Sequence, residues 1–213
     1  MTEHVQGLEA EWVARTGGAA PHAEGMSDKL PRREATYEDL ERVPSHCVAE
    51  LIGGELYVSP RPRFTHSRAA GRLFNALGPL DVGPEGVSPG GWVILFAPEL
   101  HFGRDVVVPD LAGWRRERMP ELPDVAATTL APDWVCEVLS PSTEVVDRAR
   151  KMDVYAREGV RHVWLVDPRP RMLEIHRSEA GRWFRLGVHV GDVTVRAEPF
   201  EAIALPLGRL WQR

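Results

Sequence analysis

The sequence predicts an α/β or α+β protein in which one mixed β-sheet is flanked by helices. Three observations lead to this fold class. Short runs rich in β-branched and aromatic residues recur along the chain, with segments of helical periodicity between them. The run Trp134–Leu139 is apolar except for Glu137, which is typical of a central strand covered on both faces. The segment after it has helix-start and helix-stop signals, so a helix is expected to pack against the sheet.

The start of the chain differs from the rest. Residues 1–30 show little hydrophobic periodicity and contain a run of Gly, Ala and Pro at 17–21. A segment of this kind has too little apolar surface to bury for folding by itself. We therefore predict a flexible N-terminal arm over 1–30 and a single domain over 31–213.

The domain is expected to begin with a short helix and a hairpin. Thr36 and Asp39 have the spacing of a capping box, which predicts a helix that ends near Val43. Two strand-like runs flank Gly53-Gly54, and paired glycines between such runs favour a two-residue hairpin turn.

A longer helix and several strands follow. Residues 64–77 have helical periodicity, and Pro79 predicts the end of that helix. The apolar positions that set the periodicity are Phe64, Ala69, Leu73, Ala76 and Leu77. Beyond it, strands are predicted over Trp92–Phe96, Glu99–Phe102, Val106–Val108, His162–Val166, Met172–His176, Trp183–Leu186 and Val193–Val195. The last of these form a C-terminal β extension.

The helix after the central strand has clear boundaries in the sequence. Ser142 or Thr143 can serve as its N-cap, and Gly159 is a typical residue just past a helix end. The apolar stripe expected to face the sheet consists of Val145, Ala149, Met152 and Ala156.

Composition excludes several classes of protein. Hydrophobic residues make up 43% and charged residues 27%, and no apolar run approaches the ~20 residues that span a membrane. The first residues carry acids and no apolar segment, so no secretory signal is predicted and a cytoplasmic location is expected. The two cysteines, Cys47 and Cys136, lie in apolar stretches and are expected to be buried thiols rather than a disulfide.

The charge pattern contains one informative residue. A net charge of -5 counts against a protein that coats nucleic acid through bulk charge, although it leaves room for a locally basic cleft. Among 26 basic residues only Lys29 and Lys151 are lysines. A lysine in so arginine-rich a chain indicates a position where arginine will not serve, with chance as the alternative.

Two carboxylates lie at or within predicted strands. Asp110 follows an apolar strand, and Glu137 interrupts the central one. A buried carboxylate is costly without a partner or a metal. Two of them on neighbouring strands can share Mg²⁺ or Mn²⁺, and a water on such a cation can attack a phosphodiester. The alternative for Asp110 is a turn residue after Pro109.

The lengths of the predicted strand and helix place Lys151 at the same height as Glu137. The strand runs on for about three residues beyond Glu137, roughly 10 Å at ~3.3 Å each. A helix that starts near Thr143 and packs back antiparallel returns by about 12 Å before Lys151, at ~1.5 Å per residue. The ammonium of Lys151 can therefore point at Glu137, where it can orient water or steady a phosphate. An ordinary exposed helix position is the alternative.

At these residues the sequence resembles a known family. The matching segments are Glu50–Leu56, Val106–Asp110, Cys136–Thr143, the set Asp147, Lys151 and Tyr155, and Gly159–Pro168. They resemble the bacterial restriction endonuclease-like proteins of the Uma-two family, within the PD-(D/E)xK nuclease superfamily, over roughly residues 35–210.

The resemblance implies a restriction endonuclease-like fold with a mixed central sheet. It implies Asp110 and Glu137 as metal ligands and Lys151 as the catalytic lysine, because Leu139 occupies the position where the superfamily expects lysine. Glu55 would match an additional acid on the hairpin, and Glu50 is the alternative. Strand register decides between them, since residues an odd number apart point to opposite faces.

Three functional hypotheses follow. The leading one is a Mg²⁺-dependent endonuclease that hydrolyses DNA, with His66 and Arg68 as weaker candidates for phosphate binding. Cleavage of both strands of a duplex would favour a homodimer. The second is a catalytically inactive nucleic-acid-binding or protein-interaction module on the same fold. The third is a nuclease for RNA or repair intermediates.

Overall fold

The structure is a computed structural model that describes residues 33–81 and 90–212. The chain divides into residues 1–33 and 34–213, and the account below concerns the second part. The N-terminal arm predicted over 1–30 lies outside the described residues. Within the described ranges, no helix is long and apolar enough to cross a membrane.

The short helix and the hairpin predicted after residue 35 are both present. Helix α2 (Tyr37–Glu41) begins at a capping box, in which the Thr36 amide donates to the Asp39 carboxylate at 2.8 Å. Strands β1 (Cys47–Ile52) and β2 (Glu55–Pro60) then form an antiparallel hairpin around Gly53-Gly54. Both turn glycines have positive φ, which explains why glycine occupies them.

The mixed α+β class is confirmed, but the strands form two larger sheets rather than one. The first sheet has the order β2-β1-β5-β4-β7 and the second β11-β10-β9-β8-β6-β3. Their remaining members are β3 (Trp92–Phe96), β4 (Glu99–Phe102), β5 (Asp105–Val107), β6 (Leu111–Arg115), β7 (Ala127–Thr128), β8 (Trp134–Val138), β9 (His162–Asp167), β10 (Met172–Glu179) and β11 (Arg182–Val190). The second sheet is mixed, because β8 and β9 are parallel and its other pairs antiparallel.

The chain crosses between the sheets at Pro109. The strand predicted over Val106–Val108 corresponds to β5, which ends at Val107, and β6 starts at Leu111. Proline has no amide hydrogen to donate to a β-ladder, so an interruption here is physically reasonable. As a result, Asp110 lies at the junction of the two sheets.

Helix α3 (Phe64–Asp81) runs past the predicted stop. Pro79 lies inside the helix, so the prediction that it ends the helix is wrong. Proline removes one hydrogen bond of the helix interior. Burial of the final turn compensates, because Leu80 on that turn is part of the core beside Leu77.

The helix after the central strand also departs from its prediction. It consists of a π-helical turn, η1 (Val146–Lys151), and the helix α4 (Met152–Arg157), and it ends before Gly159 as predicted. The predicted apolar stripe is wrong at its start, because Val145 is 79% exposed and Ala149 is also exposed. The buried face instead carries Asp147, Lys151, Met152, Val154 and Tyr155. The face that packs against the sheet therefore includes two charged residues, Asp147 and Lys151, that the predicted stripe did not contain.

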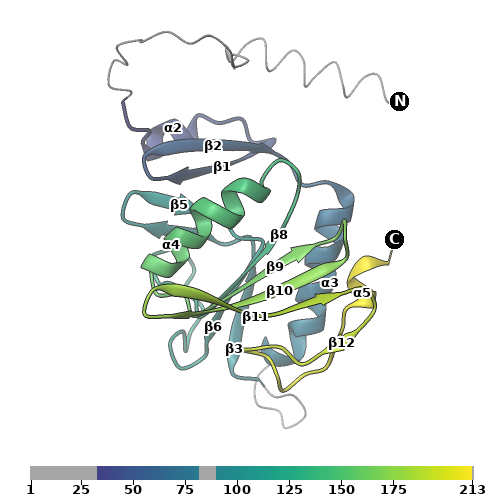
Figure 1. The fold of residues 1–213 in the computed structure, drawn as a ribbon. Coiled ribbons are helices and arrows are strands. Elements are labelled where there is room, and N and C mark those ends of the chain that lie inside the picture. Colours follow the sequence, from purple (N-terminus) through teal and green to yellow (C-terminus); the bar gives the residue numbers. More distant parts are fainter. Residues whose placement is uncertain (1–32, 82–89, 213) are drawn as a thin grey trace, which may run out of the picture. The chain divides into compact units, whose positions relative to one another are not determined.

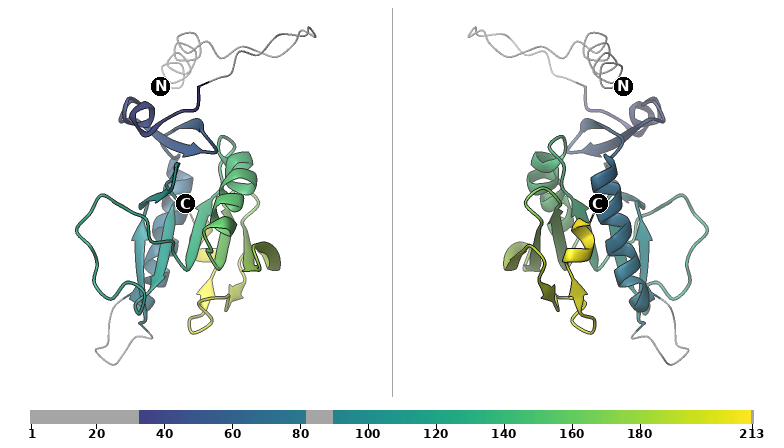
Figure 2. Two further views of the ribbon diagram at one scale, coloured as in Figure 1. Left: turned by 90° about the vertical axis from the view of Figure 1, so that its left-hand side faces the viewer. Right: turned by 90° about the vertical axis from the view of Figure 1, so that its right-hand side faces the viewer.

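The second sheet is covered on both faces. Residues of α3 share one core cluster with Trp134, Cys136 and Val138, and α4 shares the other with Val135 and Leu139. Figures 1 and 2 show the two helices on opposite sides of the strands. Side chains alternate along a strand, so Glu137 faces the α4 side.

The predicted C-terminal β extension completes the α3 side. Strands β12 (Thr194–Val195) and β13 (Leu205–Pro206) pair with each other, and α5 (Gly208–Trp211) follows. Phe200 lies in the loop between the strands and makes edge contacts with Trp92, Trp134 and Trp164 at centroid distances of 4.8, 4.9 and 5.4 Å. This aromatic group joins the C-terminal segment to the central sheet. The cysteines form no disulfide; Cys136 is buried, whereas Cys47 is only partly buried.

We predict that Phe200→Ala destabilises the fold by about 3–5 kcal/mol, because it opens a cavity among three buried indole rings. Urea unfolding followed by tryptophan fluorescence measures the change in free energy of unfolding. Phe184→Ala is the matched control, since Phe184 is 49% exposed on β11. Equal losses in the two variants would contradict the packing role of Phe200.

Candidate active site

A buried lysine is the centre of the site. The Lys151 Nζ lies 2.8 Å from Oε1 of Glu137 and 3.0 Å from Oε1 of Glu50. It also lies 3.5 Å from Oδ1 of Asp147 and 3.4 Å from the carbonyl oxygen of Val108. Only 3% of the Lys151 side chain is exposed. The lysine is therefore satisfied by carboxylates from both sheets and from its own helix.

The local structure explains how Glu137 and Lys151 meet. Glu137 is the one charged residue of β8, which is buried at every position and has strands on both sides. Lys151 ends the π-helical turn that packs back over that strand. Because π-helical turns commonly occur at functional sites, the location of this one on the Lys151 segment is informative.

The hairpin contributes Glu50, and Glu55 lies away from the lysine. Glu50 Oε1 accepts a hydrogen bond from the Val108 amide at 2.8 Å in addition to its contact with Lys151. Glu55 is exposed and accepts a hydrogen bond from the Tyr57 hydroxyl at 2.7 Å. The structure therefore brings Glu50, not Glu55, to the other candidate residues.

The predicted test, that Glu50 and Glu55 point to opposite faces of the hairpin, is wrong. Glu50 pairs with Tyr57 and Ile52 pairs with Glu55, so both acids lie on the same face of the hairpin. The odd-number rule holds within one strand but not across a two-residue turn. Position along the ribbon, rather than face, separates Glu50 from Glu55.

Asp110 forms the edge of the site. Its Oδ2 accepts a hydrogen bond from the Val138 amide at 2.7 Å, next to Glu137, and its Oδ1 lies 2.6 Å from Nε2 of His66. At 18% exposure, its side chain is more open than those of Glu137 and Lys151. His66, from the first turns of α3, thus belongs to the site. The Arg68 side chain contacts the C-terminal segment instead, where its Nε donates to the Gln212 carbonyl.

Sequence reasoning gave no role to Tyr155 or Asp147. The Tyr155 hydroxyl donates to Glu137 Oε1 at 2.5 Å, and Asp147 lies one turn before Lys151. The signal was present in the sequence, because Asp147, Lys151 and Tyr155 follow one another at intervals of four. Residues four apart lie on one helix face.

Comparison with known proteins agrees with this fold. The sequence model of the Uma2 family, described as "Putative restriction endonuclease", matches residues 35–208. The chain belongs to the Uma2 family. A solved structure from Anabaena variabilis, described as "a putative nuclease belonging to DUF820", is 20% identical with a TM-score of 0.67. That similarity covers 83% of this chain and 97% of the other, and it supports the fold. No curated protein matches the chain significantly.

Charges in this Uma2 site are strongly coupled. Burial raises the pKa of Glu137 well above its ordinary value, and Asp147, Asp110 and Glu50 raise it further against the opposing effect of Lys151. Burial also raises the pKa of Asp147, and the largest opposing effect is that of Lys151, which lowers it. Burial lowers the pKa of Lys151, but Glu137, Glu50 and Asp147 outweigh it and hold that pKa well above its usual range. The site thus has more carboxylates than its one ammonium can balance.

The donor types suit a hard divalent cation. Glu50, Asp110, Glu137 and Asp147 supply carboxylate oxygens, which Mg²⁺ prefers. As these side chains stand, no three His, Cys, Asp or Glu residues of the described chain converge closely enough to hold a metal ion. The ammonium of Lys151 lies among the oxygens instead. The set therefore fits a metal by its chemistry and would need to rearrange around one.

We predict that Lys151→Met lowers the free energy of unfolding by about 3–5 kcal/mol near neutral pH, because it leaves buried carboxylates without a counter-ion. The loss should shrink as pH falls from about 8 to about 5. Lys151 lowers the pKa of Glu137 and of Asp147, so its removal raises both pKa values further. The folded variant then binds protons more readily than the folded wild type, and acid stabilises the variant more.

Urea titrations at both pH values test this pH dependence. Arg150→Met is the matched control, since Arg150 precedes Lys151 and is exposed. We expect it to change the free energy of unfolding by less than about 0.5 kcal/mol at either pH. A Lys151→Met loss of the same size at both pH values would count against the charge argument.

Proposed function

We propose that this protein is a Mg²⁺- or Mn²⁺-dependent nuclease that hydrolyses phosphodiester bonds of DNA. The observation that carries the proposal is the group of Glu50, Glu137 and Asp147 around the ammonium of Lys151. Asp110 lies beside this group, since its carboxylate accepts the amide of Val138, the residue after Glu137. Family membership supports a nuclease function, because the Uma2 description is that of a restriction endonuclease.

Asp110 and Glu137 are the residues that would hold the metal. Asp110 is the more exposed of the two and marks the side from which a substrate can approach. When bound, a divalent cation would lower the pKa of a bound water and offset negative charge on the phosphate.

The other residues of the site have supporting tasks. The Tyr155 hydroxyl fixes one oxygen of Glu137, and His66 fixes one oxygen of Asp110. Glu50 holds Lys151 from the opposite sheet. The Lys151 ammonium can then donate to a phosphate oxygen as negative charge develops, a contribution that grows in a site shielded from water.

One observation favours a second candidate. Lys151 already has close carboxylate partners, and an ammonium neutralised in this way is also typical of a structural ion pair. A catalytically inactive nucleic-acid-binding module with the same fold would keep that arrangement. Metal binding separates the two candidates, because only the nuclease needs Asp110 and Glu137 as ligands.

The test compares cleavage by wild type, Glu137→Gln and Lys151→Met in Mg²⁺, in Mn²⁺ and in chelator. Single-stranded DNA, duplex DNA and RNA are the substrates. We expect wild-type cleavage that needs metal, and a loss of about 100-fold or more in either variant. Wild-type cleavage of duplex on both strands would further predict a homodimer, which sedimentation can measure.

The two hairpin acids provide a matched pair. Glu50→Gln should lower cleavage because it releases Lys151, whereas Glu55→Gln should leave it near the wild-type value because Glu55 contacts only Tyr57 among the side chains described. Cleavage that is equal in wild type, Glu137→Gln and Lys151→Met would refute the nuclease proposal.

A further inference from the structure

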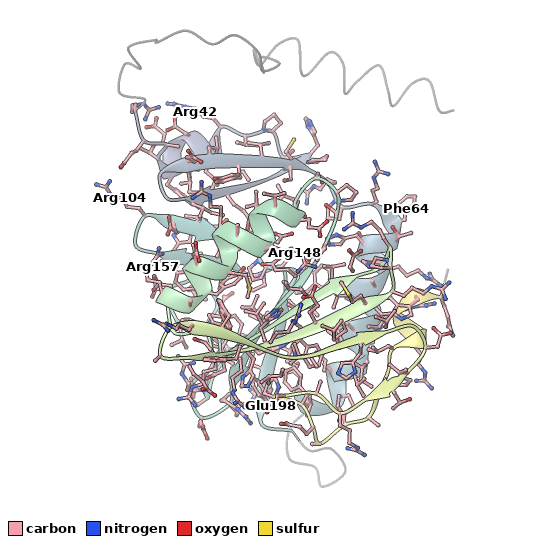
Figure 3. The ribbon with its side chains drawn as sticks, in the orientation of Figure 1. Arg42, Phe64, Arg104, Arg148, Arg157 and Glu198 are labelled. Carbon is pink, nitrogen blue, oxygen red and sulfur yellow. The ribbon has the colours of Figure 1, made fainter. Side chains whose placement is uncertain are left out.

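An exposed aromatic residue, Phe64, lies on the first turn of α3, which also carries His66. Phe64 is 94% exposed, which is the largest exposed fraction of any large hydrophobic side chain among the described residues. Figure 3 labels it at the start of α3. Single exposed hydrophobic side chains are common on protein surfaces, so it is the setting of Phe64 that makes it a candidate for contact with a ligand.

The helix holds Phe64 in a fixed place. Further along α3, Ala69, Ala70 and Leu73 are completely buried, so the first turns are anchored by their own helix. Two residues after Phe64, His66 contacts Asp110 at 2.6 Å. Two steps of ~3.8 Å put the Cα atoms of Phe64 and His66 within about 8 Å of each other. Phe64 therefore lies at the edge of the candidate active site, on a different side of the helix from His66.

The chain around Phe64 is locally basic. Residues 56–80 contain four arginines and no Asp or Glu, although the whole protein has a net charge of -5. Arg68 and Arg72 bind carbonyl groups near the C-terminus, and Arg61 binds the Ser45 carbonyl. Arg63, directly before Phe64, is exposed and has no side-chain partner in the part of the chain that the structure describes. Its charge is available to a phosphate.

We infer that Phe64 and Arg63 form a contact site for single-stranded DNA, in which the phenyl ring stacks on an unpaired base and the guanidinium pairs with a neighbouring phosphate. This inference rests on the proposed nuclease function for its choice of DNA. Stacking on aromatic rings combined with cationic contacts to the backbone is how proteins hold single strands without sequence preference. Because His66 on the same helical turn contacts Asp110, a strand held at this end of α3 can reach the carboxylates of the site.

Chemistry favours a single strand over a duplex. The phenyl ring cannot hydrogen-bond to base edges or phosphates, so it gains affinity only from the face of a base. In a duplex those faces are covered by neighbouring bases, and uncovering one is costly. A single-stranded region offers them without that cost.

The test measures binding in chelator, so that cleavage plays no part. Wild type, Phe64→Ala, Phe64→Leu and Phe64→Trp are titrated with a fluorescent single-stranded oligonucleotide and with the matching duplex. We expect Phe64→Ala and Phe64→Leu to bind the single strand roughly tenfold more weakly and Phe64→Trp to bind it as well as wild type. Duplex binding should not change among them.

Two further variants sharpen the result. Arg63→Gln should reduce the salt dependence of single-strand binding by about one phosphate contact. Phe184→Ala, an exposed phenylalanine on the edge strand β11, should bind like wild type. Unfolding curves confirm that the surface variants remain folded.

The outcomes distinguish this inference from the nuclease proposal. Single-strand binding that is unchanged in Phe64→Ala overturns the inference even if the wild type cleaves DNA. A loss in Phe64→Ala that Phe64→Trp restores supports it even if no substrate is cleaved. A change of oligomeric state in Phe64→Ala without a change in binding also overturns it, because the ring would then contact a second copy.

Discussion

The ion pair between Lys151 and Glu137 fixes the relation of three parts of this fold. The ammonium lies between Glu137 on the second sheet, Glu50 on the first and Asp147 on its own helical turn. A buried charge without a partner is strongly unfavourable, so each of these elements is held where its carboxylate can reach the lysine. The apolar cores on either face of the second sheet give stability, whereas the charged contacts determine how the hairpin and η1 are set against that sheet.

The junction at Pro109-Asp110 has a complementary effect. Because the ladder is interrupted there, Asp110 is freed from regular pairing and its carboxylate accepts the amide of Val138. The same aspartate contacts His66 from α3, on the other side of the sheet from α4. Elements from both faces therefore meet where the chain passes from β5 of the first sheet to β6 of the second. A site at such a place can be partly open while its lysine remains buried.

Much of this could be predicted from the sequence, and the failures have physical causes. A single acid within an apolar run identifies Glu137, and strand and helix lengths bring Lys151 to its level, because both arguments use only local geometry. The apolar stripe of the following helix was misplaced since its inward face is charged, and periodicity counts apolar residues alone. The choice between Glu50 and Glu55 depended on how a two-residue turn pairs the strands, which parity within one strand does not describe. Helix α3 continues through Pro79 because tertiary burial of Leu80 outweighs a local stop signal.

Net charge says little about the candidate site, and the structure shows why. Acidic residues of the candidate site contribute to the overall value of -5, yet they are gathered around one buried ammonium and do not describe the outer surface. The segment that leads into α3 has the opposite character, with arginines and no acids over 56–80. Screening limits the range of surface electrostatics to about 10 Å. A charged molecule near this segment therefore interacts with the local positive charge more than with the net charge of the whole protein. Acidic side chains in the candidate site and basic ones in the adjoining segment therefore lie close together in the fold although they oppose each other in the net charge.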